Sequence, residues 1–158
     1  MVKVGIVMGS TSDMPVMEET CKLLKEFDIE YEVKILSAHR TPDEAIAYAR
    51  GAYDRGFRVL IAGAGGAAHL AGVLAGVTTL PVIGVPMSTN MMGGLDSLLS
   101  IVQMPSGVPV ATVAVGKAGA KNAAVLALTI LGTSDEIYHQ KLVEYKENMR
   151  KMVLANNE

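Results

Sequence analysis

The sequence predicts one α/β domain in three layers, a five-stranded parallel sheet with helices on both faces and an additional C-terminal helix. Short apolar runs rich in β-branched residues alternate along the 158 residues with longer segments of helical period. Glycine, serine or proline marks most of the changes from one to the other. Strands and helices that alternate in this way form parallel sheets through right-handed crossovers. For five strands the commonest order is 2-1-3-4-5.

Each expected element has its own signal in the sequence. Five strands are expected where apolar residues run together or alternate with polar ones: 2–8, 29–36, 58–62, 80–85 and 110–115. Six helices are expected where apolar residues recur at helical spacing: 14–27, 41–55, 67–75, 95–104, 118–131 and 134–154. Asp13 is placed to act as an N-cap, and Thr41 with Glu44 forms a capping box. The intervening segment 86–94 is expected to be a mobile loop.

The last helix differs from the others, because its apolar stripe is narrow and resembles that of a coiled coil. The stripe steps by four and three residues through Tyr138, Leu142, Tyr145, Met149 and Met152. Its partner is either the protein's own sheet or a neighbouring subunit. We expect a single domain over 1–158, with 134–158 as a C-terminal helix that packs on neighbouring subunits.

Composition excludes several classes of protein. Half of the residues are hydrophobic and the net charge is −2, so no broad basic surface is available for nucleic acid or an anionic membrane. The apolar excess favours a homo-oligomer. His69, Thr78 and Pro81 interrupt the longest apolar stretch, which is too short to span a membrane. The single cysteine, Cys21, excludes an intrachain disulfide and is typical of a reducing cytoplasm, where we expect a buried structural thiol.

Three unusual loops follow the first three predicted strands. They are Gly-Ser-Thr-Ser-Asp at 9–13, Ser-Ala-His-Arg-Thr-Pro at 37–42 and the glycine-rich run at 62–69. In the order 2-1-3-4-5 these loops meet at the carboxyl edge of the sheet, around the point where the strand order reverses. Ligands bind at that point in open α/β sheets. The three loops therefore predict the binding site.

The residue types in these loops suit a phosphorylated, ribose-bearing ligand. Ser10 and Ser12 offer hydroxyls near a helix N-terminus, and Asp13 offers a carboxylate for ribose hydroxyls. Arg40 can hold a phosphate through its planar guanidinium. His39 has the only side chain there that ordinarily gives and takes a proton near neutral pH.

The other histidines and the lack of metal-site or flavin-site patterns limit the reactions that the site could perform. His69 is either a second polar group of the site or a capped core residue, whereas His139 on the last helix is expected to be exposed. No cysteine or histidine cluster has the spacing of a metal site. With no tryptophan and two phenylalanines, the chain is poorly suited to stack a flavin. The sequence thus predicts no cofactor and no metal.

Taken together, four segments resemble one enzyme family. They are the loops at 9–13 and 37–42, Ala-Gly-Ala-Gly-Gly-Ala-Ala-His-Leu at 62–70 and Asp-Ser-Leu-Leu-Ser-Ile-Val-Gln-Met-Pro at 96–105. The resemblance is to the N5-carboxyaminoimidazole ribonucleotide mutases of purine biosynthesis and covers about residues 3–131. Ala71 departs from it, since a proline is expected after His-Leu.

The resemblance implies an isomerase that moves a carboxyl group from the exocyclic nitrogen to C4 of an aminoimidazole ribonucleotide. It implies that His39 is the general acid and base, and that Ser10, Asp13 and Arg40 bind phosphate and ribose. Ser12, Ser37 and the backbone around Gly65 would line the site, and His69 would position the carboxyl group. The family is also similar in being octameric.

Two other functions stay open at this point. One is the sister carboxylase, which uses free CO2 directly. The other is a non-catalytic nucleotide- or flavin-binding domain with the flavodoxin-like strand order, which the scarcity of aromatic residues disfavours.

Overall fold

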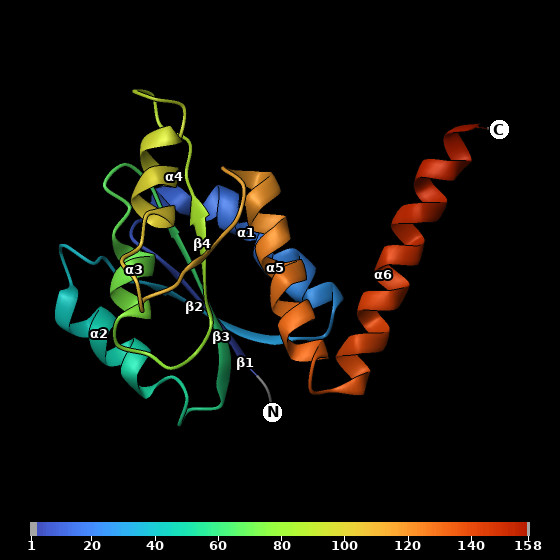
Figure 1. The fold of residues 1–158 in the computed structure, drawn as a ribbon, viewed down its shortest axis with the longest axis horizontal. Helices are drawn as coiled ribbons and strands as arrows, with labels where there is room; N and C mark the ends of the chain where they lie inside the picture. The colour runs from blue at the N-terminus through green and yellow to red at the C-terminus, as the bar shows by residue number, and fades with distance from the viewer. Residues whose placement is uncertain (1–2, 158) are drawn as a thin grey trace.

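The computed structural model describes residues 3–157 and contains the expected five-stranded parallel sheet (Figure 1). The strand order is β2-β1-β3-β4-β5, as predicted. The strands are β1 Lys3–Met8, β2 Glu30–Ile35, β3 Phe57–Ala64, β4 Val82–Pro86 and β5 Ala111–Thr112. Every pairing is parallel, so the carboxyl ends of the strands meet at one edge. Val2, the first residue of the first expected strand, lies outside the described residues.

Helices cover both faces of the sheet (Figure 1). They are α1 Met14–Glu26, α2 Pro42–Gly51, α3 Leu70–Ala75, α4 Leu95–Val102, α5 Lys117–Gly132 and α6 Glu136–Leu154, with short 3-10 turns at Thr11–Asp13 and Ala155–Asn157. One core joins the sheet to α1 and α5, and a second joins its other face to α2, α3 and α4. The central strand β3 is buried along all but one of its eight residues, which accounts for its nearly continuous apolar sequence.

Several expected boundaries and caps were wrong. The strand expected over 110–115 is reduced to two paired residues, and the second helix ends at Gly51 and not near residue 55. Asp13 and Thr41 stand at N-cap positions without a side-chain capping bond. The Thr41 hydroxyl instead accepts from the Ser37 amide over 2.8 Å, because local side-chain bonds compete with capping.

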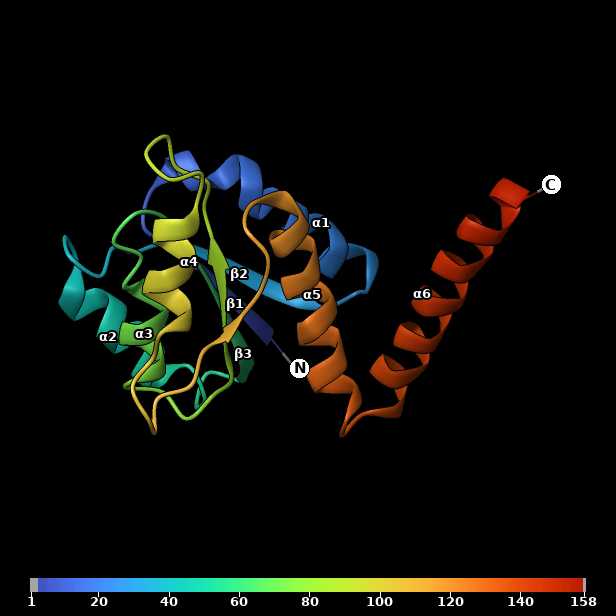
Figure 2. The same ribbon diagram turned by 45° about the horizontal axis from the view of Figure 1, so that its top comes forward.

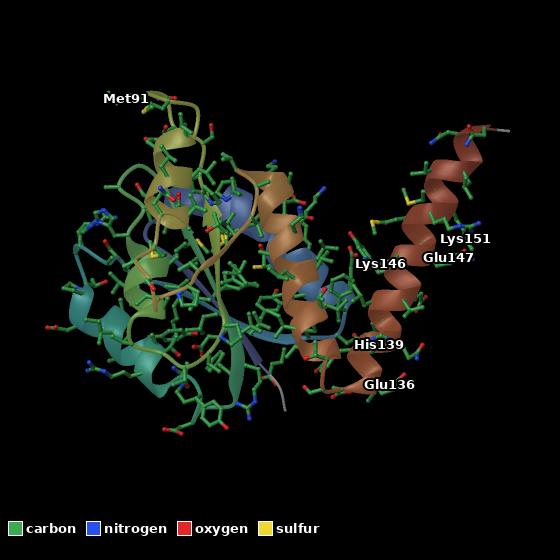
Figure 3. The ribbon with its side chains drawn as sticks, viewed as in Figure 1. Met91, Glu136, His139, Lys146, Glu147 and Lys151 are labelled. Atoms are coloured by element: carbon green, nitrogen blue, oxygen red, sulfur yellow. The ribbon has the colours of Figure 1, made fainter. Side chains whose placement is uncertain are left out.

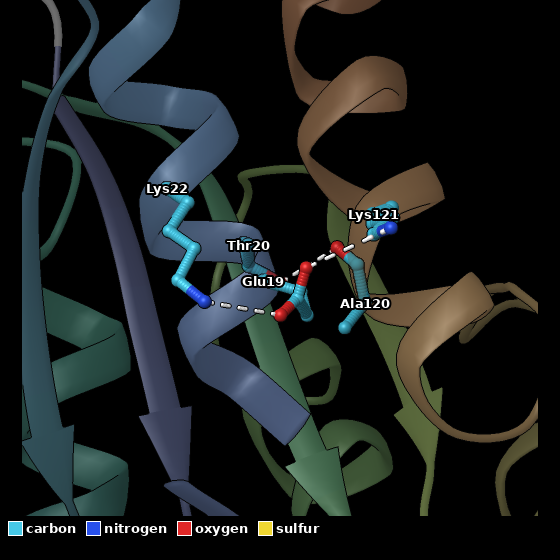
Figure 4. A network of polar contacts seen from close by, with 5 residues as sticks. All are labelled: Glu19, Thr20, Lys22, Ala120 and Lys121. Atoms are coloured by element: carbon cyan, nitrogen blue, oxygen red, sulfur yellow. Dashed lines mark hydrogen bonds and ion pairs between the residues drawn. The ribbon is translucent and has the colours of Figure 1, made fainter. Parts of the chain in front are cut away.

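Small residues bring α1 and α5 close together on one face of the sheet. Ala120, Ala123 and Ala124 of α5 are fully buried, as expected of this alanine-rich helix. The buried Thr20 hydroxyl donates a hydrogen bond of 2.6 Å to the Ala120 carbonyl (Figure 4). On the rim of this contact, Glu19 lies 3.2 Å from Lys22, and the hydrogen bond from Lys22 lowers the pKa of the Glu19 carboxyl.

Replacement of Gly119 by alanine is expected to destabilise the protein by about 3 kcal/mol. A Cβ at this position of α5 would lie 1.6 Å from the Ala114 carbonyl oxygen, so the backbone must move. Gly51→Ala is the matched control, because nothing lies within 4 Å of its added Cβ and alanine favours the helix by up to ~1 kcal/mol. Urea unfolding at one protein concentration measures both, and equal midpoints would contradict the prediction.

The C-terminal helix α6 leaves the body of the molecule after a tight turn and extends away from it (Figures 1 and 2). The Asp135 carboxylate caps its first turn by accepting from the Ile137 amide over 2.9 Å. Tyr138, Leu142 and Tyr145 pack against the core that α1 and α5 share. Met149 and Met152, further along the same stripe, are 43% and 73% exposed. The stripe is therefore divided, with its first part on the protein's own body and its second part uncovered.

No helix within residues 3–157 is both long enough and apolar enough to cross a membrane.

Candidate active site

The loops that follow β1, β2 and β3 meet at the carboxyl edge of the sheet, where β1 lies between β2 and β3. Together they line a cleft of about 310 Å³. All eight predicted site residues line it: Ser10, Ser12, Asp13, Ser37, His39, Arg40, Gly65 and His69. The structure thus brings the predicted set together, and the role of each residue stays a prediction.

The loop after β4 also contributes to the cleft, which the sequence reasoning missed. Met87 and Ser88 line it, together with Leu70 at the start of α3. The predicted strand order already indicates this contribution. In that order β4 adjoins β3, so the carboxyl end of β4 lies at the same edge of the sheet. The sequence predicts only a mobile loop at 86–94.

Arg40 ties the second loop to the first. Its Nη2 donates to the Gly9 carbonyl over 2.8 Å, and its Nε donates to the Ser37 hydroxyl over 3.3 Å. The Ser37 hydroxyl also accepts from the Arg40 amide over 3.1 Å, which closes the turn. These bonds use part of the guanidinium, which carries five N–H donors, and leave the others to meet an anion.

The first loop is shaped by its own serines. The Ser10 hydroxyl accepts hydrogen bonds from the amide and the hydroxyl of Ser12, over 3.2 and 3.0 Å. The Ser12 amide is therefore already bonded within the loop. Beside it, burial raises the pKa of the Asp13 carboxyl, and a backbone hydrogen bond with Ser10 partly offsets this effect. The half-buried carboxylate is placed to accept hydroxyl donors from a ligand.

The two histidines of the cleft are in direct contact. His39 Nε2 lies 2.6 Å from His69 Nδ1, and the two rings meet edge to face at 79° with their centroids 4.7 Å apart. One nitrogen must carry the proton that the other accepts, so the contact couples the tautomers of the two rings. Both side chains are exposed in the cleft, which excludes the alternative of a core residue for His69.

Of two residues outside the cleft, one has the surroundings expected of it. His139 is exposed on α6, as predicted (Figure 3). Cys21, expected to be buried, is only half-buried, and this partial burial raises the pKa of its thiol. Among residues 3–157 no group of three or more histidine, cysteine or acidic side chains is placed to hold a metal ion.

A model of the AIR carboxylase family matches residues 3–152 of the chain. The chain belongs to this family. Two members illustrate how far the similarity extends. The chain is 58% identical over 154 residues to the N5-carboxyaminoimidazole ribonucleotide mutase of Thermotoga maritima, an alignment that spans 98% of this chain and 89% of that protein. It is 56% identical to the mutase of the same name from Bacillus subtilis, across 98% of this chain and 96% of that one.

The fold of the AIR carboxylase family is also seen in a solved structure. A crystal structure of Treponema denticola PurE superimposes with a TM-score of 0.90 at 31% identity, covering 99% of this chain and 97% of that chain. Sequence and structure thus agree on the family along nearly the whole chain. The three loops of the cleft lie inside the matched region.

Proposed function

We propose that the chain is an isomerase that converts N5-carboxyaminoimidazole ribonucleotide into 4-carboxy-5-aminoimidazole ribonucleotide. The observation that carries the proposal is the identity of 53–58% to proteins named as this mutase, along nearly the full chain. The cleft supports it, since it combines an arginine, hydroxyls and a carboxylate with a histidine pair. The relatives are named as enzymes, so the non-catalytic alternative has no support from them.

The residues permit a mechanism with a single acid and base. Protonation of the carbamate nitrogen by His39 lets the C–N bond break and releases CO2 within the cleft. The electron-rich C4 then attacks this CO2, and the new C–C bond leaves a surplus proton on C4. The His39 imidazole, now neutral, removes that proton, so the enzyme ends in its starting state. Holding CO2 beside C4 makes the second step effectively unimolecular.

The carboxylase that uses free CO2 is the second candidate, since the matched family model is described as AIR carboxylase. The deciding experiment compares two initial rates at equal nucleotide concentration. One assay supplies N5-carboxyaminoimidazole ribonucleotide, and the other supplies aminoimidazole ribonucleotide with CO2. Faster turnover of the carbamate supports the mutase, and turnover only with free CO2 would replace it by the carboxylase.

We further propose that the protein is a homo-oligomer, an octamer, located in the cytoplasm. The second part of the α6 stripe and the neighbouring Val153 and Leu154 are between 43% and 73% exposed on a helix that extends away from the body (Figure 2). A second copy of the chain is the expected partner of this surface. The only cysteine is unpaired, which suits a reducing compartment.

Met152→Asp is expected to lower the mass of the assembly in sedimentation at micromolar concentration, because it places a charge in the uncovered stripe. Tyr53→Asp is the matched control, since Tyr53 is also an exposed apolar residue, at 56%, but belongs to the turn after α2 and not to the α6 stripe. A native protein that sediments as a monomer would contradict the proposed assembly.

A further inference from the structure

Two serines of α4 hold the glycine turn that follows β3. The Ser97 hydroxyl accepts a hydrogen bond of 2.9 Å from the Gly66 amide. The Ser100 hydroxyl shares its single proton between the Asp96 carbonyl of its own helix, over 2.8 Å, and the Gly66 carbonyl, over 3.2 Å. Both backbone polar groups of Gly66 are therefore bound by side chains from α4, which stands beside α3 and β4 (Figure 2).

Ser97 is a buried polar residue whose hydrogen bond to Gly66 offsets the cost of its burial. Ser97 is fully buried, which among the described residues it shares with only one other polar side chain, that of Thr20. A buried hydroxyl is costly unless it is hydrogen-bonded, and serine forms helices less readily than alanine. Its partner Gly66 has φ +67°, in the left-handed region that favours glycine. The serine thus stabilises a turn that few other residues could form.

The held turn leads directly to the histidine pair. The Gly66 carbonyl also accepts from the Ala68 amide over 2.8 Å, and the His69 amide donates to the Ala67 carbonyl over 2.9 Å. These two tight turns connect Gly66 to the ring that lies 2.6 Å from His39. Gly65 and Ala67, on either side of Gly66, line the cleft. A displacement of Gly66 would therefore move both the lining and His69.

We propose that Ser97 and Ser100 are positioning residues for the carboxyl transfer. They fix Gly66, and so keep the glycine turn close to the reacting carbon and His69 against His39. The inference rests on the proposed function and deepens it. Between cleavage of the C–N bond and formation of the C–C bond, CO2 is bound to neither atom. A displaced turn leaves space through which this CO2 exchanges with CO2 from solution before it is captured.

The test measures what fraction of the carboxyl carbon in the product comes from CO2 in solution. Ser97→Ala and Ser100→Ala are assayed with unlabelled N5-carboxyaminoimidazole ribonucleotide in buffer containing 13C-labelled CO2, with an enzyme-free blank subtracted. Both variants are expected to raise the labelled fraction of product severalfold. Because a displacement of about 1 Å can cost ~100-fold in rate, we expect kcat to fall about tenfold or more while KM changes less than about threefold.

Thr20→Val is the matched control for the loss of a buried hydroxyl. It removes a hydrogen bond of 2.6 Å to the Ala120 carbonyl on the face of the sheet that α1 and α5 cover. This variant is expected to melt at a lower temperature with native kcat and a native labelled fraction. Should Ser97→Ala fail to fold, Ser100→Ala decides, since Ser100 is only half-buried. A native labelled fraction in the serine variants that fold, or an equal rise in Thr20→Val, would overturn the proposal.

A second measurement separates this inference from the proposed function. The imidazole 15N chemical shifts of His39 and His69 report their contact in the free protein, without any substrate. We expect Ser97→Ala or Ser100→Ala to change these shifts and Thr20→Val to leave them unaltered. A native protein that makes no carboxylated product would overturn the proposed function and with it the role in carboxyl transfer, while the shifts would still show whether the two serines hold the histidine contact. Unchanged shifts in both serine variants would overturn the positioning role, whatever the activity.

Discussion

Replacement of His39 by asparagine is expected to reduce turnover by about 10²–10⁴-fold, the usual contribution of a general acid or base, with little effect on substrate affinity. His39 contributes the ring that faces His69 in the cleft, while the predicted phosphate and ribose contacts come from Arg40 and Asp13. The amide of asparagine cannot transfer a proton at neutral pH. Initial rates of product formation and calorimetric binding of the substrate measure the two effects separately.

Two further variants sharpen this prediction. In His39→Gln the terminal amide reaches the position of Nε2 and can still bond His69 Nδ1, so the contact persists without a proton donor and acceptor. We expect this variant to be as inactive as His39→Asn, and native turnover in it would show that hydrogen bonding and not proton transfer is required. His139→Asn is the matched control and should retain native turnover, because His139 is exposed on α6 (Figure 3).

The sequence was informative about the fold wherever burial dictates the pattern. The β3 run is apolar because both faces of that strand are covered, and this pattern predicted a central parallel strand. The apolar run at 110–115 predicts a longer strand than β5, but only Ala111 and Thr112 pair with β4. Sheet pairing at an edge depends on the path of the chain, which apolar pattern alone does not report.

The composition of the cleft was predictable because topology brings consecutive strand ends together. The contact between His39 and His69 was not, since it depends on two side-chain conformations from loops 30 positions apart. The role of Ser97 and Ser100 was hidden for a similar reason. Both belong to a segment that resembles the family, but only the three-dimensional structure shows that they meet Gly66.

Arg40→Ala is expected to weaken substrate binding by about 2–4 kcal/mol, since it removes the proposed charged partner of the phosphate from a site that loses water on binding. This corresponds to a dissociation constant ~30–1000-fold higher. Part of the loss has a second origin, because Arg40 also bonds the Gly9 carbonyl and the Ser37 hydroxyl and so ties two loops together. Calorimetric titration of the variant with substrate measures the total.

Comparison of a nucleotide with its nucleoside separates these two origins of the Arg40 effect. If the guanidinium holds the phosphate, Arg40→Ala weakens binding of aminoimidazole ribonucleotide far more than binding of the same compound without its phosphate. If it only ties the loops together, both ligands lose affinity equally, and the phosphate role is wrong. Arg40→Lys keeps the charge without the planar fork and should fall between native and alanine. Arg50→Ala, which removes an exposed arginine of α2 that does not line the cleft, should bind both ligands as the native protein does.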